Sequence, residues 1–310
     1  MIKILVYGAG VIGSIFAYKL KTGENEVTIL SRGKRLEQLK KHGLILRDDI
    51  IHETFKTEID VTDKLNPEDY YDLVLVIMQR QQVSSILPIL KKNTKIPTVL
   101  FVGNNVNGAD EYLQAISKDR ILLGFGGPGG YREDNIVVIA YMDKAILYVG
   151  ELDGTISERI LNIEKIFVDS GITVDISENI DAWLKTHMAL IAPLAMASYA
   201  AQKQNKRFGE VEELIKLSLV AFRENMKALK KLGIPILPKK FKVLGWIPKF
   251  IIIKKLRDLL NSDFGRIALS GHADSAHDEM KRLVEDFREL VKDVRTNLDA
   301  NSTLYKLSFA

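Results

Sequence analysis

The chain has 310 residues, of which 46% are hydrophobic, so it can bury a sizeable core and is neither a disordered segment nor a disulfide scaffold. Its 44 basic and 40 acidic residues give a net charge of +4, which is too balanced to predict a nucleic-acid partner. Cysteine is absent, which excludes disulfides, thiol nucleophiles and cysteine-based metal sites. The five histidines are scattered, and we predict no metal site.

The first part of the chain alternates short apolar runs with helical patterns, as βαβ units around a parallel sheet do. Strands are predicted at 2–8, 26–30, 72–78, 97–103, 121–126 and 172–176, with a hairpin at 44–56. Residues 136–143 and 145–151 are predicted to pair antiparallel, and helices are predicted at 11–21, 83–92 and 155–169. The predicted fold class is therefore α/β, with a Rossmann-type parallel sheet in an N-terminal domain at residues 1–176.

From residue 177 the apolar period is helical almost throughout, so the second domain, residues 177–310, is predicted to be all-α. Helices are predicted at 180–202, 210–232 and 272–298, and residues 236–265 are predicted to be irregular. Within the irregular part, the apolar segment 244–253 is interpreted as a cap over the helical domain or a dimer contact. The alternative is a substrate lid or a membrane-surface contact, because lysines flank its apolar residues.

Location and assembly follow from the same patterns. No apolar run reaches the roughly 20 residues of a membrane span. The run at 2–17 is similar in composition to a secretory signal, but its glycine spacing has a different explanation, given next. We expect a cytoplasmic protein without stable membrane insertion that forms a homodimer.

The motif Gly8-Ala9-Gly10-Val11-Ile12-Gly13 is a GxGxxG that follows the first predicted strand and opens the first predicted helix. In this context Gly8 permits a tight turn, Gly10 lets the backbone approach a pyrophosphate, and Gly13 lets helix and strand pack closely. The helix N-terminus, with Val11 and Ile12 in its first turn, stabilises the anion. Because three glycines at this spacing cost conformational entropy without a folding benefit, we prefer a dinucleotide site to a ligand-free turn.

The end of the second predicted strand bears on the choice of cofactor. A carboxylate there would bind the ribose 2′-hydroxyl of NAD. The chain instead has Ser31 and Arg32, with Lys34 and Arg35 beyond. Cations suit a 2′-phosphate, so NADP(H) is predicted, although Arg32 as a solvated loop residue is the ordinary alternative.

A second match to the glycine pattern, at 124–129, is not followed by a helix. Pro128 and the strand-like residues after it favour a mobile loop. We assign it no phosphate and expect it to border the active site.

Lys185 is the candidate proton donor. Nearly every neighbour in AWLKTHMALIAPLAMA is apolar, so desolvation is expected to lower the pKa of Lys185, as a donor working near neutrality requires. In hydride transfer to a ketone, an ammonium stabilises the developing negative charge on oxygen and then protonates it. The alternative is a helix-surface pair with Asp181, four residues earlier.

Glu279 lies in a predicted helix with acids and bases on its exposed side, so from its surroundings it is an ordinary solvated carboxylate. His272 and His277 are five residues apart, which is not the spacing that places two metal ligands on one helical face.

Taken in order, these motifs resemble the ketopantoate reductases (2-dehydropantoate 2-reductases). The resemblance runs essentially from end to end, and the order and spacing of the motifs are more specific than any one of them. It rests on GAGVIG at 8–13, DLVLVIMQRQQV at 72–83, VGNNVNG at 102–108, YVGE at 148–151, AWLK at 182–185 and KALKKLGIPI at 227–236.

The resemblance implies an N-terminal Rossmann domain, a helical C-terminal domain, NADPH as the hydride donor, and reduction of a 2-oxo acid to a 2-hydroxy acid in pantothenate biosynthesis. It implies that Lys185 donates the proton, that Asn104 helps to bind cofactor and substrate, and that Glu279 holds the substrate hydroxyl. Gln82 matches a further substrate-binding position, and Met78 and Gln79 are assigned to the cofactor site.

The chain also departs from the family pattern. The lysine usual after the strand at 72–78 is replaced by Gln79, and the asparagines usual after the catalytic lysine are replaced by Met188, Ala189 and Ala192. Residues 236–265 are longer and more apolar than the family requires. These changes favour a larger or more apolar substrate than ketopantoate. Three hypotheses therefore stay open: a 2-oxo acid reductase, another dehydrogenase of the same two-domain plan, and a catalytically silent NADP-binding regulator.

Overall fold

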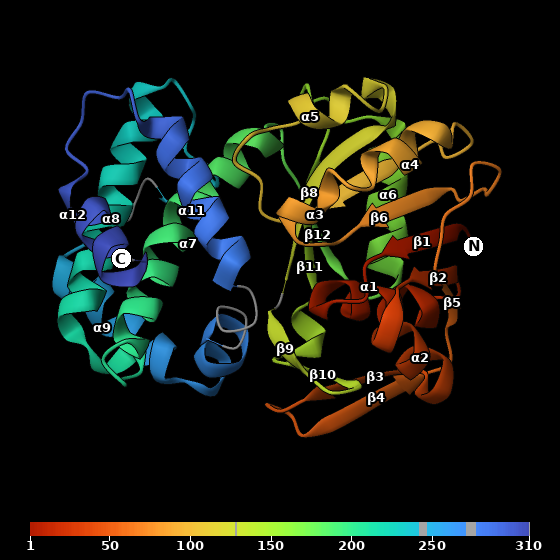
Figure 1. Cartoon of the computed structure of the whole chain (residues 1–310), viewed down its shortest axis with the longest axis horizontal. Coiled ribbons are helices and arrows are strands. Elements are labelled where there is room, and N and C mark those ends of the chain that lie inside the picture. The colour runs from red at the N-terminus through yellow and green to blue at the C-terminus, as the bar shows by residue number, and fades with distance from the viewer. Residues whose placement is uncertain (128, 242–246, 271–276, 310) are drawn as a thin grey trace. The chain divides into compact units, whose positions relative to one another are not determined.

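The computed structural model describes residues 1–127, 129–241, 247–270 and 277–309 (Figure 1). Its contacts divide the chain into two compact units. The first comprises residues 1–103 and 108–180, and the second comprises residues 104–107 and 181–310. The first unit is α/β and the second is helical, so the predicted fold class is confirmed.

The first unit is built on an eight-stranded sheet in the order β12-β11-β8-β7-β6-β1-β2-β5. Neighbouring strands run parallel except for β8 and β11, which run antiparallel. The central strands read as continuous apolar runs because helices cover both faces of the sheet. The strands are β1 Lys3–Tyr7, β2 Glu26–Leu30, β5 Asp60–Thr62, β6 Leu73–Val76, β7 Val99–Val102, β8 Ile121–Gly127, β11 Ile146–Gly150 and β12 Thr173–Ile176.

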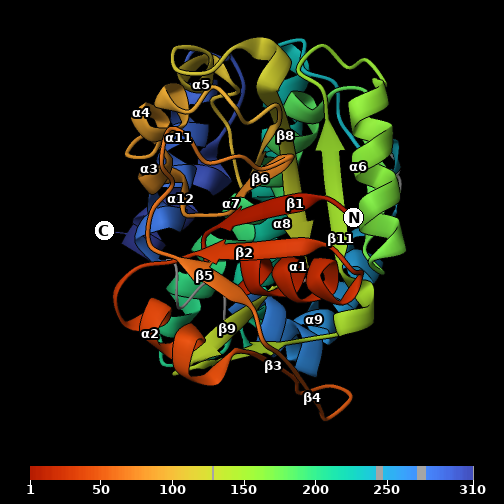
Figure 2. The same cartoon turned by 90° about the vertical axis from the view of Figure 1, so that its right-hand side faces the viewer.

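Helices cover the two faces of this sheet, with α3, α4 and α5 gathered on one side and α6 on the other (Figure 2). Phe16 of α1 and Phe167 of α6 meet edge to face at 5.6 Å, so these two helices share one core. The helices are α1 Val11–Thr22, α2 Gly33–His42, α3 Arg80–Val83, α4 Leu87–Lys92, α5 Asp110–Leu113 and α6 Glu158–Asp169.

The helix predicted at 83–92 is interrupted between α3 and α4. Pro88 lies in the first turn of α4, where its missing N–H is tolerated. Inside a longer helix the ring would clash with the carbonyl of Ser84, four residues earlier, so the prediction of one continuous helix is wrong.

A smaller four-stranded sheet has the order β4-β3-β10-β9. Its strands are β3 Leu44–Asp48, β4 Glu53–Thr57, β9 Gly130–Glu133 and β10 Ile136–Ile139. The predicted hairpin at 44–56 is confirmed, because β3 and β4 pair antiparallel.

The predicted pairing of residues 136–143 with 145–151 is wrong. Strand β10 pairs with β9 and β3, whereas β11 pairs with β8 and β12 of the large sheet. The chain changes sheets at Tyr141, which has a left-handed φ of 61°, and in the turn after it. The buried carboxylate of Asp48 accepts a hydrogen bond from the Met142 N–H at 2.7 Å and anchors this turn.

The mobile loop predicted at the second glycine pattern is also corrected. Residues Gly124–Gly127 lie in β8, and Pro128 is outside the described residues. A Cβ at Gly124 would lie 2.5 Å from the Tyr148 carbonyl oxygen of the neighbouring strand β11. Glycine is needed here for close strand approach, which explains the pattern without a ligand.

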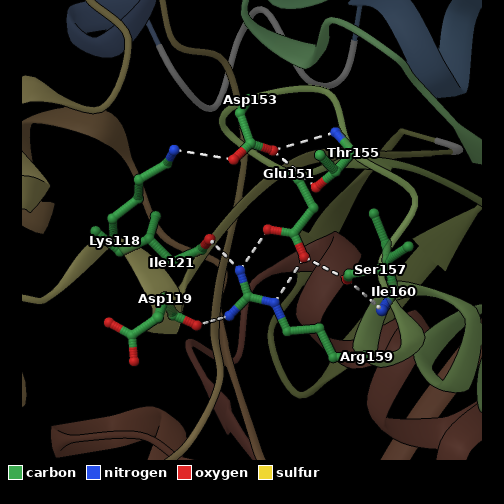
Figure 3. Close-up of polar contacts among 9 residues, drawn as sticks. All are labelled: Lys118, Asp119, Ile121, Glu151, Asp153, Thr155, Ser157, Arg159 and Ile160. Atoms are coloured by element: carbon green, nitrogen blue, oxygen red, sulfur yellow. Dashed lines mark hydrogen bonds and ion pairs between the residues drawn. The ribbon is translucent and has the colours of Figure 1, made fainter.

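Beyond β11, Glu151 ties α6 to the start of β8 through Arg159 (Figure 3). Arg159 Nε donates to Glu151 Oε1 at 2.7 Å, and Nη2 donates to the Ile121 carbonyl at 3.2 Å. Ser157, the N-cap of α6, donates to the same carboxylate at 2.5 Å. Burial alone would raise the pKa of Glu151, but the hydrogen bonds from Arg159 and Ser157 lower it below its usual value. Glu151 of the YVGE motif is therefore a structural anchor.

We expect Glu151→Gln to lower the free energy of unfolding by about 2 kcal/mol at pH 7, because the partly buried Arg159 loses its counter-charge. The native pKa of Glu151 lies below its unfolded value, so this stabilisation is present above pH 4.5 and is lost as the pH falls further. Urea unfolding at pH 7 and pH 3 measures both effects. Asp153→Asn in the exposed pair with Lys118 is the control with little expected change. Equal stability of Glu151→Gln and the unmodified protein at pH 7 would contradict the prediction.

The second unit is helical around one apolar core. The predicted helices at 180–202 and 210–232 are confirmed, but α9 lies in the segment predicted to be irregular. The helix predicted at 272–298 starts outside the described residues, which begin again at 277, and it ends at Val291. A separate helix, α12, follows, and Asn297 Oδ1 accepts the N–H of its first residue, Asp299, at 2.7 Å. The helices are α7 Ile180–Gln202, α8 Glu212–Lys231, α9 Lys249–Asn261, α11 His277–Val291 and α12 Asp299–Phe309.

The long helix α7 contains Pro193 in its interior. Proline has no N–H, so the Ala189 carbonyl, four residues earlier, lacks its helical donor. Asn225 of α8 replaces that donor, because its buried side-chain amide reaches the Ala189 oxygen at 3.0 Å. The helix that carries Lys185 is thus held to α8 at its proline.

The apolar segment 244–253 is only partly described, since residues 242–246, and with them Trp246, lie outside the described ranges. Phe250, in the first turn of α9, is 73% exposed. In the described ranges, no helix is both long and apolar enough to cross a membrane.

Candidate functional site

Four adjacent parallel strands, β7, β6, β1 and β2, end at the same edge of the large sheet. The strand order reverses between β6 and β1, which makes the crevice beyond their carboxyl ends a topological switch point. The glycine loop follows β1, Ser31 and Arg32 follow β2, and residues 78–82 follow β6. Sequence positions far apart are therefore brought together at this edge.

The glycine loop has the backbone that its spacing predicts. Gly8 has a φ of 127°, and a Cβ there would lie 2.0 Å from the Ile77 carbonyl oxygen. A Cβ at Gly13 would lie 2.1 Å from the Gly8 carbonyl oxygen, so this glycine lets α1 pack against the loop. At Gly10 a Cβ would meet nothing within 4 Å. The loop thus needs Gly8 and Gly13 for its own fold, and Gly10 leaves open space.

The first turn of α1, which contains Val11 and Ile12, contains no acidic residue, and no side chain caps it among the described residues. Its N–H groups and the helix dipole therefore present positive potential, which suits a phosphate group.

After β2, the Ser31 N–H donates to the Thr62 carbonyl at 3.0 Å, and Arg32 is the N-cap of α2. Arg32 is exposed, and its side chain has no hydrogen bond or ion pair within the described part of the chain. Lys34 pairs with Asp134 at 2.9 Å, so its charge is already matched. No carboxylate occupies the position that would suit the 2′-hydroxyl of NAD.

After β6, Gln79 stands where the family usually has a lysine, so the side chain at this edge of the sheet is neutral. Gln79 Oε1 accepts a hydrogen bond from Gln82 Nε2 at 3.3 Å and one from Gln81 at 3.0 Å. Gln82 is exposed, and Met78 and Gln79 are half-buried.

Arg80, which sequence reasoning did not assign, does not stand in for the missing lysine. Its Nη2 pairs with Glu111 of α5 at 2.6 Å, and its guanidinium lies over the Tyr112 ring at 5.5 Å. Ser84 also donates to Glu111. Burial alone would raise the pKa of Glu111, but the hydrogen bonds from Ser84 and Arg80 lower it. The positive charge of Arg80 is therefore matched within the protein, and the pair ties α3 to α5.

Asn104 belongs to the short segment 104–107 that groups with the second unit. Its Oδ1 is buried and has no hydrogen-bond partner among the described residues. A buried acceptor without a partner is costly, so this oxygen is suited to a ligand donor. The neighbouring Asn105 instead uses its Oδ1 within the turn, accepting the Asn107 N–H at 3.0 Å.

On α7, the Lys185 ammonium pairs with Asp181 Oδ2 at 2.5 Å, one helical turn earlier. This pair is the alternative that the spacing predicted. The Lys185 side chain is 14% exposed, and the second oxygen of Asp181 is buried without a hydrogen-bond partner in the described ranges. Asp181 therefore holds the ammonium close to the helix.

His187, two residues beyond Lys185, stacks on Trp183 with ring centroids 5.2 Å apart. Burial lowers the pKa of His187 to about 4, so the imidazole is neutral near pH 7. Lys185 is therefore the single cation of α7 at neutral pH.

The positions where the family has asparagines are core positions of the second unit. Met188, Ala189 and Ala192 are at most 2% exposed and pack in its apolar cluster. Glu279 lies in the first turn of α11 and is half-buried. Among the described residues, no group of three or more histidine or acidic side chains could hold a metal ion, and His272 lies outside them.

The predicted site residues thus fall into two sets. The glycine loop, Ser31, Arg32, Met78, Gln79 and Gln82 gather at one edge of the first unit, whereas Asn104, Lys185 and Glu279 belong to the second unit. The first set could be found from the strand ends alone. No sequence pattern indicates that Glu111 pairs with Arg80, because 31 residues separate the two.

The chain thus combines a Rossmann-type sheet that carries a glycine loop with a part that is all-helical. A family model described as "Ketopantoate reductase PanE/ApbA" matches residues 4–154. Residues 4–154 therefore match the ketopantoate reductase family, and the resemblance predicted from the motifs is confirmed over these residues.

The chain is also similar, at low sequence identity, to individual proteins. The chain is 29% identical over 190 residues to "Uncharacterized oxidoreductase YkpB" of Bacillus subtilis (strain 168), covering 59% of this chain and 60% of that protein. It is 20% identical over 232 residues to 2-dehydropantoate 2-reductase of Pyrococcus abyssi, covering 75% of each. The match to YkpB thus spans less than two thirds of that relative's length.

Solved structures show the same fold. A 2-dehydropantoate 2-reductase from Geobacter metallireducens GS-15 has a TM-score of 0.77 at 15% identity and covers 98% of both chains. D-mandelate dehydrogenase in a ternary structure with NADH and anilino(oxo)acetate also has a TM-score of 0.77 at 15% identity, covering 99% of this chain and 96% of that one.

Proposed function

We propose that the protein is an NADP(H)-dependent reductase that converts a 2-oxo acid to a 2-hydroxy acid, as 2-dehydropantoate 2-reductases do. The observation that carries the proposal is the glycine loop at the switch point, which is closed around Gly8 and Gly13 and open at Gly10. It lies within the family match.

The residues present fit a dinucleotide. Open space at Gly10 admits a pyrophosphate beside the N-terminus of α1, with Val11 and Ile12 in the binding turn. The unpartnered Asn104 oxygen offers an acceptor for a ligand N–H or hydroxyl. Arg32, exposed and unpaired among the described residues, offers a cation for a 2′-phosphate. When bound, the nicotinamide would supply the hydride.

The remaining roles are assigned to Gln82 of the first unit and to side chains of the second unit. Lys185 gives a proton to the carbonyl oxygen and stabilises the negative charge that develops there. Asp181 keeps the ammonium in place until the substrate oxygen replaces it as the acceptor. Glu279 accepts a hydrogen bond from the substrate hydroxyl, and Asn104 and Gln82 bind the substrate.

A larger or more apolar substrate is the second candidate. It is favoured by Gln79, which removes the family lysine, and by Arg80, whose charge is matched by Glu111. Because the positive charge of the lysine is lost, a substrate with less negative charge than ketopantoate is favoured. The fold relative D-mandelate dehydrogenase is named for an aromatic hydroxy acid. The burial of Met188 and Ala189 in the core argues for neither substrate.

The deciding experiment measures NADPH oxidation at 340 nm by the purified protein with ketopantoate, aromatic 2-oxo acids and branched aliphatic 2-oxo acids, with NADH in parallel. Rapid turnover of ketopantoate supports the first candidate and a place in pantothenate biosynthesis. Turnover of the apolar acids alone supports the second. Tight NADPH binding without turnover of any acid would contradict both and favour the silent regulator. Cytoplasmic location and a homodimer stay predictions.

For the cofactor preference, we expect Arg32→Ala to weaken NADPH binding about tenfold and to leave NADH binding within about twofold, because one charge-assisted contact to the 2′-phosphate is lost. Fluorescence titration with each nucleotide measures the two dissociation constants. If Arg32→Ala weakens both nucleotides equally, Arg32 does not read the 2′-phosphate.

A further inference from the structure

Helix α9 of the second unit has an inner face in the core and an outer face toward solvent. The inner face packs in the apolar core of the unit, through Ile252, Ile253, Leu256 and Leu260. Phe250 lies on the opposite side of the helix and is 73% exposed, and the half-buried Ile251 follows it. Two large apolar side chains therefore stand next to each other at the outer surface of the first turn.

Two lysines lie one turn beyond this apolar pair. Lys254 follows Phe250 by four residues, a spacing that places the two side chains side by side on the helix surface. Lys255 follows Ile251 in the same way. Both lysines are exposed, and neither forms an ion pair with any described residue. The outer face of α9 thus combines apolar side chains with cations that no carboxylate matches.

The sequence around α9 adds further positive charge. Residues 225–257 contain ten lysine and arginine residues and no aspartate or glutamate. The whole chain has a net charge of +4, so all its other residues together carry a net charge of −6. Within α9, Glu212 matches the charge of Arg257, and Asp258 is the one acid of the helix. The positive charge of the protein is therefore concentrated in one segment rather than spread along the chain.

A surface of this kind matches the headgroup region of a bilayer that contains anionic lipids. Exposed apolar side chains enter the boundary between headgroups and acyl chains, and neighbouring lysines extend to the anionic headgroups. Helix α9 has 13 residues, fewer than the roughly 20 that a membrane span needs, so it would lie along the surface.

Two other partners fit the outer face less well. A symmetric contact with a second copy of the chain would place the lysines of one copy against the same lysines of the other. Nucleic acid would match the positive charge, but its phosphates offer no apolar environment for an aliphatic side chain such as Ile251. An anionic bilayer accommodates both the charge and the apolar groups.

We propose that the outer face of α9, formed by Phe250, Ile251, Lys254 and Lys255, binds reversibly to a membrane surface that contains anionic lipids. The binding is peripheral, since it uses the side of a helix whose other side stays in the core of the unit. The proposal is independent of the proposed reductase activity, because α9 lies outside residues 4–154 and contains none of the residues assigned to catalysis or cofactor binding.

The test is co-sedimentation of the full chain with vesicles of two compositions. One is phosphatidylcholine with about 30% phosphatidylglycerol, and the other is phosphatidylcholine alone. The unmodified protein is expected to bind the anionic vesicles and to leave the neutral ones unbound. Sodium chloride at about 0.5 M is expected to weaken the binding, because salt screens the attraction between lysines and headgroups.

Variants of the outer face are expected to weaken binding to the anionic vesicles. Lys254→Gln combined with Lys255→Gln should raise the dissociation constant about 25-fold, because each lysine at an anionic surface contributes about a fivefold factor. Phe250→Gln should raise it about tenfold, because its apolar ring no longer enters the bilayer. These side chains are exposed, so the variants are expected to fold, which thermal unfolding checks.

Each change has a matched control elsewhere in the chain. Lys91→Gln combined with Lys92→Gln alters the net charge by the same amount, at two adjacent exposed lysines of α4. Leu161→Gln removes an apolar side chain of α6 that is 44% exposed. Both controls are expected to bind the anionic vesicles within about twofold of the unmodified protein.

Several results would overturn the proposal. These are equal binding of neutral and anionic vesicles, unchanged binding in both α9 variants, or equal losses in the controls. Tight binding of polyuridylic acid without vesicle binding would assign the basic segment to nucleic acid. A dimer that Phe250→Gln dissociates, again without vesicle binding, would assign the face to a contact between copies. NADPH titration of the same samples keeps the two proposals apart, since vesicle binding without NADPH binding contradicts the proposed function alone.

Discussion

Replacement of Lys185 by alanine is expected to reduce kcat by about 10³-fold, because the positioned proton donor and the cation beside the carbonyl oxygen are both lost. NADPH binding is expected to stay within about twofold, since Lys185 is not among the proposed cofactor contacts. Stability is expected to change little, as the pair with Asp181 is a single i,i+4 ion pair. Stopped-flow NADPH oxidation at saturating substrate and a fluorescence titration of NADPH measure the first two quantities.

Asp181→Asn is the matched control for this experiment. It removes the same ion pair as Lys185→Ala but keeps the ammonium. If the ion pair were the sole role of Lys185, the two variants would have equal effects on kcat. We expect Asp181→Asn to retain at least about a tenth of the turnover, a loss within the usual range for misplacing one group. Retained turnover in Lys185→Ala would remove this lysine from the mechanism.

Alanine substitutions in the glycine loop are expected to separate folding from binding. In Gly13→Ala the new Cβ would lie 2.1 Å from the Gly8 carbonyl oxygen, a backbone atom that cannot move aside without disturbing the loop. We expect the free energy of unfolding to fall by about 3 kcal/mol, in line with overpacking of a close contact. Thermal or urea unfolding measures the loss.

Gly10→Ala is expected to show the opposite pattern. Gly10 has a φ of −74°, which alanine adopts without strain, and its Cβ would meet nothing within 4 Å. The variant should be as stable as the unmodified protein or about 0.5 kcal/mol more stable. NADPH binding should weaken at least about tenfold, because the methyl group occupies the space that the pyrophosphate needs. Unchanged NADPH binding in Gly10→Ala would mean that the pyrophosphate does not bind at this loop.

Local features of the fold could be predicted because their causes lie within a few residues of each other. Residues close in sequence determine the apolar runs of β1, β6 and β7 and the helical period of α7. The glycine spacing at 8–13 likewise reflects close contacts within one loop. The Lys185–Asp181 pair is local in the same sense, since four residues on a helix form one turn. The ends of the parallel strands then indicated where the loop, Ser31 and Arg32 would meet.

Features that depend on distant partners could not be predicted in this way. Strand β11 is apolar enough to pair with several strands, and only the competition among all of them assigns it to β8 and β12. The sequence shows Arg35 and Arg80 as similar cations after strands. The fold buries Arg35 with the Asn135 carbonyl as a hydrogen-bond acceptor, and it gives Arg80 the carboxylate of Glu111. The sequence specifies which charges exist, whereas long-range packing determines which of them are neutralised within the protein and which can bind a ligand.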